Sequence, residues 1–389
     1  MIEPTADARR AEGWIAAATP LVTFVVLGLP AGAIGVAWPA MRSSFAAPLA
    51  GLGLLLAGVT IAYFLGSAIS GPLGARVGGM TLLIVGCALA GLGELALSVA
   101  WQWWLVPVFG VFVGSGSGLI DASVNTRVSL HRGIRYMGWL HASWAVGAAF
   151  GPQLVSGSLA LTGSWRPAFA TAGLAFLACA LLASTQRRQW STARDANQST
   201  LEERRVAGYR GATVVLAGLL LLGAALEATT GDWSYSQLTL GRGIGFAIAS
   251  LGASLFWAGL AAGRMALGVL GHRLPPARLL DLSILSCVLA AGLFWLFPAA
   301  IAAVVALPAL GLGVSLLYPL VLSLTPARVG TEMTGHSVGY GLAVGTIGGG
   351  ALPAGVGVIL QSAGLWTLGP ILFVMAAVLL LLHLLSRDG

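Results

Sequence analysis

Most of the sequence consists of apolar segments that are long enough to cross a lipid bilayer. A membrane-spanning helix needs about 20 apolar residues. Only α-helices and closed barrels satisfy their backbone polar groups in lipid, and these segments lack the alternation of a barrel strand. We therefore predict an all-α membrane protein with twelve transmembrane helices, at residues 14–40, 48–73, 80–100, 104–128, 137–161, 165–186, 211–237, 243–270, 277–297, 299–325, 333–360 and 365–385.

The composition leaves little chain for a soluble domain. Of the 389 residues, 57% are hydrophobic and 8% are charged, whereas soluble proteins carry about 25% charged residues. The first apolar segment is too long for the core of a signal peptide, so we expect it to be retained as the first span. The three cysteines all fall inside apolar segments. We interpret them as packing residues and expect no disulfide, metal or cofactor.

The basic residues, all of them arginines, predict the orientation in the membrane. With the N-terminus in the cytoplasm, every arginine falls on the inner side except Arg42, Arg166 and Arg242, which fall outside, and Arg264, which lies within a span. Basic residues concentrate in cytoplasmic loops. We therefore expect a multi-pass protein of the cell (inner) membrane with both termini cytoplasmic. The net charge of +7 fits an anionic lipid surface, and we expect no nucleic-acid partner.

A weak internal repeat divides the chain into two halves. The domains that we predict are a cytoplasmic tail (1–13), a six-helix half (14–186), a cytoplasmic linker (187–210), a second six-helix half (211–386) and a short cytoplasmic tail (387–389). Two parallel halves of this kind place a solute site near the membrane midplane. Five residues of the first half recur 197 positions later: Gly66, Gly71, Leu73, Gly74 and Arg76 correspond to Gly263, Gly268, Leu270, Gly271 and Arg273. The segment Ala145-Val-Gly147 recurs 198 positions later as Ala343-Val-Gly345.

Glycines recur at every fourth position in two of the spans. This spacing lets helix backbones approach closely, so we predict tight helix packing there. The residues are Gly110, Gly114 and Gly118 in the fourth span and Gly341, Gly345 and Gly349 in the eleventh.

Asp121 is a carboxylate inside an apolar span. Such a group costs roughly 2.5 to 3.5 kcal/mol on insertion scales, so it normally faces a protein interior or a wet cavity and has a function. Asn125 lies one turn further on the same face and can hydrogen-bond the carboxylate. We interpret Asp121 as a proton-coupling residue. The alternative is a structural ion pair with Arg127 or Arg264.

The seventh and eighth spans carry further ionisable residues. Glu227 and Asp232 are both candidates for binding a proton, a cation or a substrate amine. They point to different faces of an ideal helix, so they act as a pair only if the helix breaks near Gly231. Arg264 needs a carboxylate partner or water. We interpret it as part of a structural ion pair, with anionic-substrate binding as the alternative.

Two motifs resemble the major facilitator superfamily. Gly71-Pro-Leu-Gly-Ala-Arg-Val-Gly78 is similar to its loop motif, although Ala75 replaces the usual aspartate. Gly114-Ser-Gly-Ser-Gly-Leu-Ile-Asp-Ala-Ser-Val-Asn125, followed by the segment 137–152, resembles the fucose permease-like branch, which includes sugar:proton symporters and bacterial relatives akin to rhizopine-transport proteins. The resemblance implies two pseudo-symmetric six-helix halves and a proton site at Asp121. It also implies a second acid in the first span, where this chain has Gly35.

The same resemblance places a sugar-contacting position at His141, and Trp144 lies one turn further on the same face. Aromatic rings whose polar groups can hydrogen-bond offer a stacking surface for a sugar. For each ring taken alone, packing is the simpler interpretation. The remaining candidates for substrate binding are Trp38, Trp233, Tyr318 and Tyr340.

These features predict a secondary active transporter that works by alternating access. We expect proton-coupled symport of a small polar solute, of sugar or polyol type, by a monomer. The alternatives are a proton-antiport exporter of hydrophobic or cationic compounds and a non-transporting membrane receptor. No phosphate-cradling motif and no nucleophile-base set occur in the sequence, so we expect neither ATP drive nor an enzyme.

Overall fold

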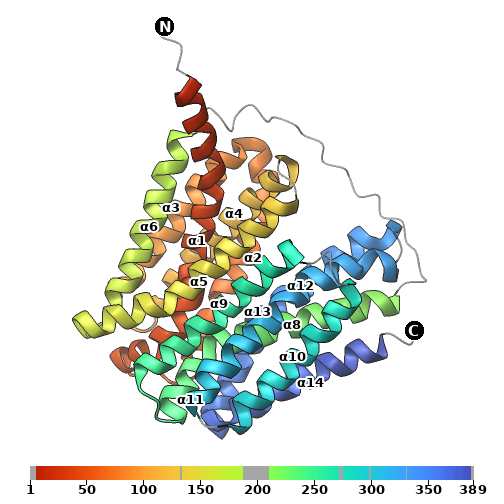
Figure 1. Cartoon of the computed structure of the whole chain (residues 1–389). Coiled ribbons are helices and arrows are strands. Elements are labelled where there is room, and N and C mark those ends of the chain that lie inside the picture. Colours follow the sequence, from red (N-terminus) through yellow and green to blue (C-terminus); the bar gives the residue numbers. More distant parts are fainter. Residues whose placement is uncertain are drawn as a thin grey trace. The chain divides into compact units, whose positions relative to one another are not determined.

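The computed structural model describes residues 6–131, 134–186, 210–270, 275–297, 299–329 and 331–386. Within these residues the chain forms helices and no strands, which confirms the predicted all-α fold (Figure 1). The long helices are α1 (Ala6–Phe45), α2 (Gly51–Val77), α3 (Gly79–Ser98), α4 (Leu105–His131), α5 (Ile134–Thr162), α6 (Arg166–Thr185), α8 (Arg210–Ser236), α9 (Phe246–Leu270), α10 (Pro276–Leu296), α12 (Leu307–Val329), α13 (Thr331–Ala363) and α14 (Leu368–Leu385).

Short helical segments join some of these helices. A π-helical turn, η1 (Gln237–Gly241), follows α8, and α11 (Ala299–Ile301) with the π-helical η2 (Ala302–Ala306) precedes α12. A 3-10 turn, η3 (Leu365–Thr367), precedes α14. Among the described residues, 11 helices are long and apolar enough to cross a membrane. The 29-residue α5 is not one of them, and it carries the polar residues His141 and Gln153.

The chain forms two compact units. Unit 1 contains Met1–Pro30, Gly58–Gly147 and Arg166–Ser199, and unit 2 contains Ala31–Ala57, Ala148–Trp165 and Thr200–Gly389. The second part of α1, the start of α2 and the second part of α5 therefore belong to unit 2 and pack with the C-terminal helices. Residues 1–5 of the predicted N-terminal tail, the predicted C-terminal tail and nearly all of the predicted linker lie outside the described residues, whereas residues 6–13 of the N-terminal tail belong to α1.

Unit 1 is built around α3, which packs against α4 and α6. Its core contains side chains from α1, α3, α4, α5 and α6, among them Phe24, Leu83, Ile120, Leu140 and Phe176. Cys87 and Cys179 are buried in this core, and Cys287 is buried in unit 2. The interpretation of the cysteines as packing residues agrees with this burial.

Glycines bring α2 and α4 into backbone contact. A Cβ on Gly114 would collide with the carbonyl oxygen of Val59, and a Cβ on Gly118 would collide with that of Tyr63. The close approach predicted for this glycine series is thus confirmed at two positions. In α13 the backbone contact is made by Gly348, whose Cβ would meet the carbonyl of Leu221. At Gly345, which the spacing predicted as a contact, a Cβ would lie 3.6 Å from the nearest atoms of Leu220, an ordinary contact distance. Helix α8 therefore packs most closely on the side of α13 that carries Gly348.

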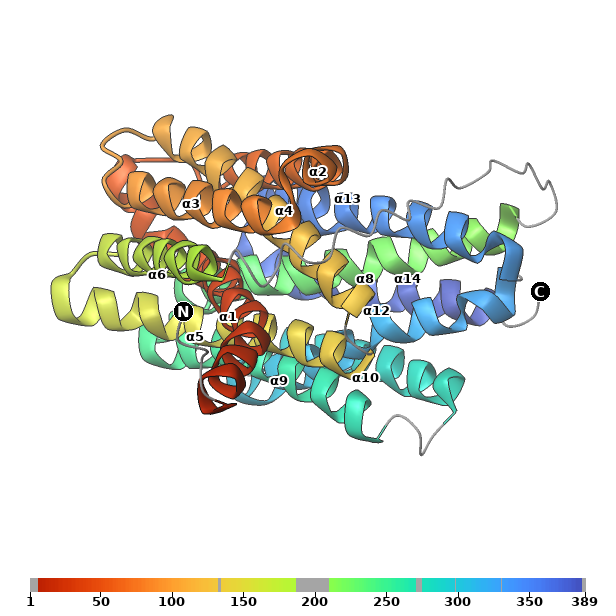
Figure 2. The ribbon, with the colours of Figure 1, turned by 90° about the horizontal axis from the view of Figure 1, so that it is seen from above.

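Unit 2 is held together by long helix pairs. Helix α8 lies beside α13 (Figure 2), α9 packs against α12, and α10 packs against both α12 and α14. The α9–α12 pair also depends on glycine. A Cβ on Gly311 would collide with the carbonyl of Phe256, and one on Gly259 would collide with that of Pro308.

The three arginines that we predict on the outer side bind carbonyl groups at helix C-termini. Arg42 donates from Nε to Ala47 O at 3.1 Å, just beyond the end of α1. Arg166 donates to Ser98 O at 2.9 Å, at the end of α3. Arg242 donates to the carbonyls of Phe294 and Phe297, at 2.6 and 3.1 Å, at the end of α10. Cations stabilise helix C-termini, so these arginines have a local structural role.

We expect Gly114→Ala to destabilise the protein by about 1 to 3 kcal/mol, because the added methyl group overpacks a backbone contact. The matched control is Gly138→Ala in α5, where a Cβ meets nothing within 4 Å. That control should be neutral or slightly stabilising, because alanine favours helix. Thermal unfolding in detergent measures both variants, and equal effects would contradict the predicted importance of the contact.

Candidate functional site

Asp121 lies in α4 and accepts two hydrogen bonds from neutral side chains. The hydroxyl of Tyr63 donates to Oδ2 at 2.8 Å, and Nδ2 of Asn125 donates to Oδ1 at 3.0 Å. The predicted hydrogen bond between Asp121 and Asn125 is therefore present. Both residues are half-buried. Among the described residues, Asp121 forms no ion pair.

Tyr63 is a site residue that the sequence did not reveal. It lies on α2, and its backbone carbonyl is the group that Gly118 of α4 approaches. Because glycine removes a side chain at this crossing, the two helices come close enough for the phenol to reach Asp121. The available signal was a single tyrosine in a largely apolar span, and a lone tyrosine does not indicate which acid it contacts.

Neutral partners leave Asp121 free to change its protonation state. As a carboxylate it accepts from both donors, and as an acid it can donate to the tyrosine hydroxyl, which is also an acceptor. A proton can therefore bind or leave without breaking an ion pair. Arg127 lies six residues further along α4 and is half-buried.

Unit 2 holds a second charged group with a different arrangement. Nη2 of Arg264 in α9 lies 3.4 Å from Oε2 of Glu227 in α8, and the two side chains are 17% and 20% exposed. Arg264 thus has the carboxylate partner that a guanidinium in an apolar span requires. A proton on Glu227 would remove the charge that faces Arg264, so this acid is less free to titrate than Asp121.

Asp232 is buried five residues after Glu227 on the same helix. Helix α8 runs without a break from Arg210 to Ser236, so the two acids lie on different faces of the helix. They therefore do not form a pair.

Position 35 contacts the backbone of α8 beside Asp232. A Cβ placed on Gly35 would lie 2.6 Å from the carbonyl oxygen of Gly231 and 2.8 Å from that of Asp232. Contacts under 3.0 Å are too short for a real Cβ, so this packing has no space for the acid that the resemblance implies at position 35. The carboxylate in this region is on α8 instead.

Further contacts join the helices at the same end of unit 2. This end carries the turn at residues 46–50, and we call it the 46–50 end. The backbone N–H of Ala50 donates to Oε1 of Gln361 in α13 at 2.7 Å. Nε2 of Gln153 in α5 donates to Ser254 Oγ in α9 at 3.1 Å. Helix α2 also approaches α13 closely, since a Cβ on Gly53 would lie 3.0 Å from Ala354 O. The 46–50 end is therefore packed shut in this state.

Two of the predicted aromatic residues are fully buried. The indole N–H of Trp38 donates to Leu49 O at 3.1 Å, and that of Trp233 donates to Pro353 O at 2.9 Å. Neither ring is open to a solute in this state. Tyr318 and Tyr340 are exposed.

The other two predicted contacts lie in unit 1. The ring of His141 packs edge-on against Phe24, with centroids 6.0 Å apart. Trp144 is partly buried against the core of the unit. Both side chains are half-buried. Their roles in solute binding stay predictions.

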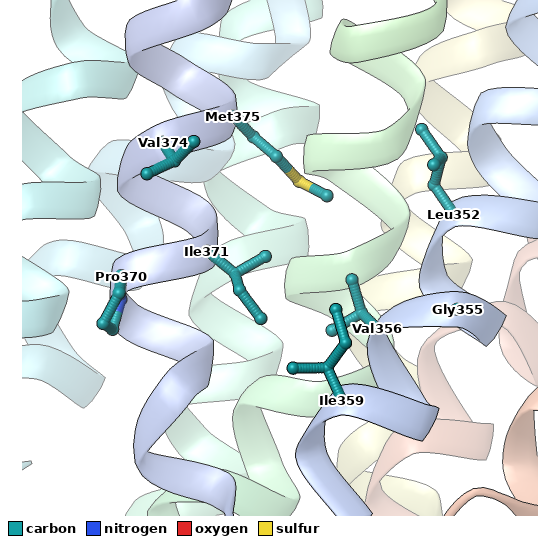
Figure 3. A pocket seen from close by; sticks show the side chains of 8 residues that line it. All are labelled: Leu352, Gly355, Val356, Ile359, Pro370, Ile371, Val374 and Met375. Atoms are coloured by element: carbon teal, nitrogen blue, oxygen red, sulfur yellow. The ribbon is translucent and has the colours of Figure 1, made fainter. Parts of the chain in front are cut away.

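A groove of about 490 Å³ lies between α13 and α14 (Figure 3). Every residue that lines it is apolar, so it provides no side-chain hydrogen-bonding groups for a polar solute. Its lining residues are Leu352, Gly355, Val356, Ile359, Pro370, Ile371, Val374 and Met375.

The sequence that forms these helices matches a known family. The profile of the Major Facilitator Superfamily matches residues 21–353. The chain belongs to this superfamily. It is accordingly a secondary transporter. A search of curated protein sequences gave no significant match, and the fucose permease-like branch stays a prediction.

Solved structures share the fold of this superfamily member. A bacterial homologue of the human lysosomal transporter Spinster, in an inward-facing and occupied conformation, matches with a TM-score of 0.75 and 16% identity, covering 99% of this chain and 98% of that chain. A variant of the nucleoside transporter NupG matches with a TM-score of 0.78 and 14% identity, covering 96% and 99%. At such identities the likeness shows the fold alone.

We expect removal of either partner of the Glu227–Arg264 pair to destabilise the protein. Breaking a fully buried pair costs about 3 to 5 kcal/mol, and the partial exposure here places the loss nearer about 2 kcal/mol. The double variant Glu227→Gln/Arg264→Gln should recover part of this loss, because no unpaired charge remains. A double-mutant cycle of unfolding measurements tests the coupling, and strictly additive losses would contradict it.

We expect Gly35→Val to hold the 46–50 end open, because its side chain collides with backbone atoms of α8. The matched control is Gly157→Val in α5, where a Cβ meets nothing within 4 Å. Spin labels at the exposed positions Ser43 and Ser362, in a background without native cysteines, report the separation of α1 and α13. A longer distance in Gly35→Val alone is the expected result, and unchanged distances would contradict the role of this contact.

Proposed function

We propose that this transporter couples uptake of a small polar solute, of sugar or polyol type, to proton entry. The observation that carries the proposal is the environment of Asp121, an intramembrane acid held by Tyr63 and Asn125. Ionisable residues inside a membrane generally mark ion or substrate pathways. Because both of these partners are neutral, Asp121 can take up or release a proton without disturbing a cation.

A single titrating carboxylate is sufficient for coupling. The membrane field supplies about 2.3 kcal/mol per elementary charge for each 100 mV. A proton that enters on Asp121 and leaves on the other side therefore drives solute accumulation of tenfold or more at ordinary membrane potentials. Alternation of the site between the two membrane faces supplies the required change in exposure.

The charge balance favours an uncharged solute. Arg264 is compensated by Glu227, so the pair does not require an anionic ligand. Asn125 and His141 provide neutral hydrogen-bonding groups, which suit the hydroxyl groups of a sugar or polyol. The likeness of the α4 and α5 segments to sugar symporters supports the same solute class.

The proposal includes an orientation and an assembly state. Both termini lie in the cytoplasm, the 46–50 end faces outward, and the protein works as a monomer in the inner membrane. The arginine distribution supports the orientation. The helix-capping contacts of Arg42, Arg166 and Arg242 account for the arginines that remain outside.

We expect Asp121→Asn to abolish proton-driven accumulation while it preserves solute exchange. The asparagine keeps hydrogen-bonding capacity but takes up no proton. Proteoliposomes with an imposed inward proton gradient and a panel of labelled sugars and polyols provide the measurement. The control is Ser123→Ala, a buried residue of α4 whose hydroxyl bonds only its own helix, at Ile120 O.

Unchanged accumulation by the Asp121→Asn variant would refute the coupling role. Solute-driven proton movement in the opposite direction would favour the alternative, an exporter that works by proton antiport. If no solute moves and none shifts the thermal stability of the purified protein, the receptor alternative is supported.

A further inference from the structure

The last two turns of α8 and the first residue of η1, Gln237, form a buried stretch that is rich in polar side chains. Buried polar residues are concentrated there more densely than in any other described segment of the chain. The acid Asp232, 7% exposed, lies in the middle of the stretch. The polar residues are Thr229, Thr230, Asp232, Ser234, Ser236 and Gln237.

Three hydroxyl groups in this stretch have no hydrogen-bond partner among the described residues. A hydroxyl in a helix has a local acceptor four residues back. Thr230 uses it, donating to Leu226 O at 2.7 Å, whereas the hydroxyls of Thr229, Ser234 and Ser236 make no hydrogen bond to any residue that the structure describes. A buried polar group without a partner costs about 1 to 3 kcal/mol. A cost of this size, repeated within two turns of one helix, indicates a ligand.

Two of these hydroxyls share a face with the acid. At 100° per residue, Thr229, Asp232 and Ser236 fall within about 60° of one another around the helix. Ser234 lies on a different face, about 160° from Ser236 and from Asp232. Asp232 is therefore flanked along the helix by one unpartnered hydroxyl on each side.

No cation is paired with this acid among the described residues. Arg264 is taken up by Glu227, and Arg242 is bound to the carbonyls at the end of α10. The carboxylate of Asp232 and the two flanking hydroxyls together offer several oxygen ligands. Because no cation in the described part of the chain is paired with the carboxylate, this group carries a net charge of minus one. Hard metal cations prefer oxygen ligands, and a charge of minus one is neutralised by a monovalent ion.

We propose that Thr229, Asp232 and Ser236 form a binding site for a monovalent metal cation, with sodium as the reference ion. Thr229 and Ser236 are about 10.5 Å apart along the helix axis. One bare ion does not span that distance, so the ion keeps part of its hydration shell. Asp232 supplies the charge, and the hydroxyls on either side hold the ion or its water.

Helix α1 controls access to this site. Gly35 contacts the backbone of α8 at Gly231 and Asp232, so α1 covers the segment while the 46–50 end is closed. The ion enters when α1 moves away from α8. This site goes beyond the proton-coupled transport proposed above and does not depend on Asp121.

Thermal unfolding of the purified full-length protein tests the site. Sodium chloride is titrated against choline chloride at constant ionic strength. A ligand that binds the folded state raises its stability with concentration, so sodium should raise Tm in a saturable manner. Asp232→Asn should remove the effect. Thr229→Val and Ser236→Ala should each raise the half-saturating sodium concentration about tenfold, the equivalent of one lost ligand contact.

Ser234→Ala is the matched control, because it removes an equally buried and unpartnered hydroxyl from a different face of the same helix. It should leave the sodium response unchanged, and so should Asp121→Asn. If the Asp232→Asn variant does not fold, the double variant Thr229→Val/Ser236→Ala takes its place in the test. This double variant retains the carboxylate of Asp232 and removes both hydroxyls.

An absent sodium response overturns the proposal, and so does a response that all variants share, since that is a general salt effect. If Tm depends on pH but not on the concentration of any alkali cation, Asp232 binds a proton instead of a metal ion, and the proposal is also overturned. An equal response to potassium supports a monovalent site without selectivity. Because the readout is equilibrium stability, it is independent of whether Asp121 couples protons to transport.

Discussion

Close backbone contact between helices is the constraint on which this structure depends. In lipid, helices gain little from burying apolar side chains against each other, so packing and small residues determine where they meet. Glycine makes these contacts at the α2–α4, α9–α12 and α1–α8 crossings, where a Cβ would collide with a carbonyl group. Each crossing also determines which polar groups lie near one another. Gly118 brings Tyr63 to Asp121, and Gly35 brings α1 against the segment that carries Asp232.

The acids of the two units differ in the groups that surround them. Asp121 is held by two neutral donors, Glu227 by a guanidinium, and Asp232 by no cation among the described residues. These three environments favour three chemical roles. A neutral environment suits a proton that comes and goes, an ion pair suits a permanent charge, and a buried acid flanked by hydroxyls suits a bound cation.

The sequence predicted the fold well because lipid allows so few solutions. Long apolar segments indicated the helices, and the glycine spacing indicated the close approach of α4. The glycine series of α13 was less well predicted. The spacing placed the contact at Gly341, Gly345 and Gly349, while the backbone contact is made by Gly348. Spacing shows that glycines share a face, but only the position of α8 decides which glycine meets it.

The composition and order of residues by themselves determined the all-helical membrane fold, the superfamily, and the acids that lie inside spans. These properties follow from the cost of placing polar groups in lipid, which acts on each segment separately. The spacing of residues also indicated Asn125 as a partner of Asp121, but tertiary structure alone decided the partners that come from other helices. Tyr63 lies 58 positions from Asp121 and Arg264 lies 37 positions from Glu227. Such pairs form where helices cross, and a crossing depends on backbone packing between segments that no local pattern connects.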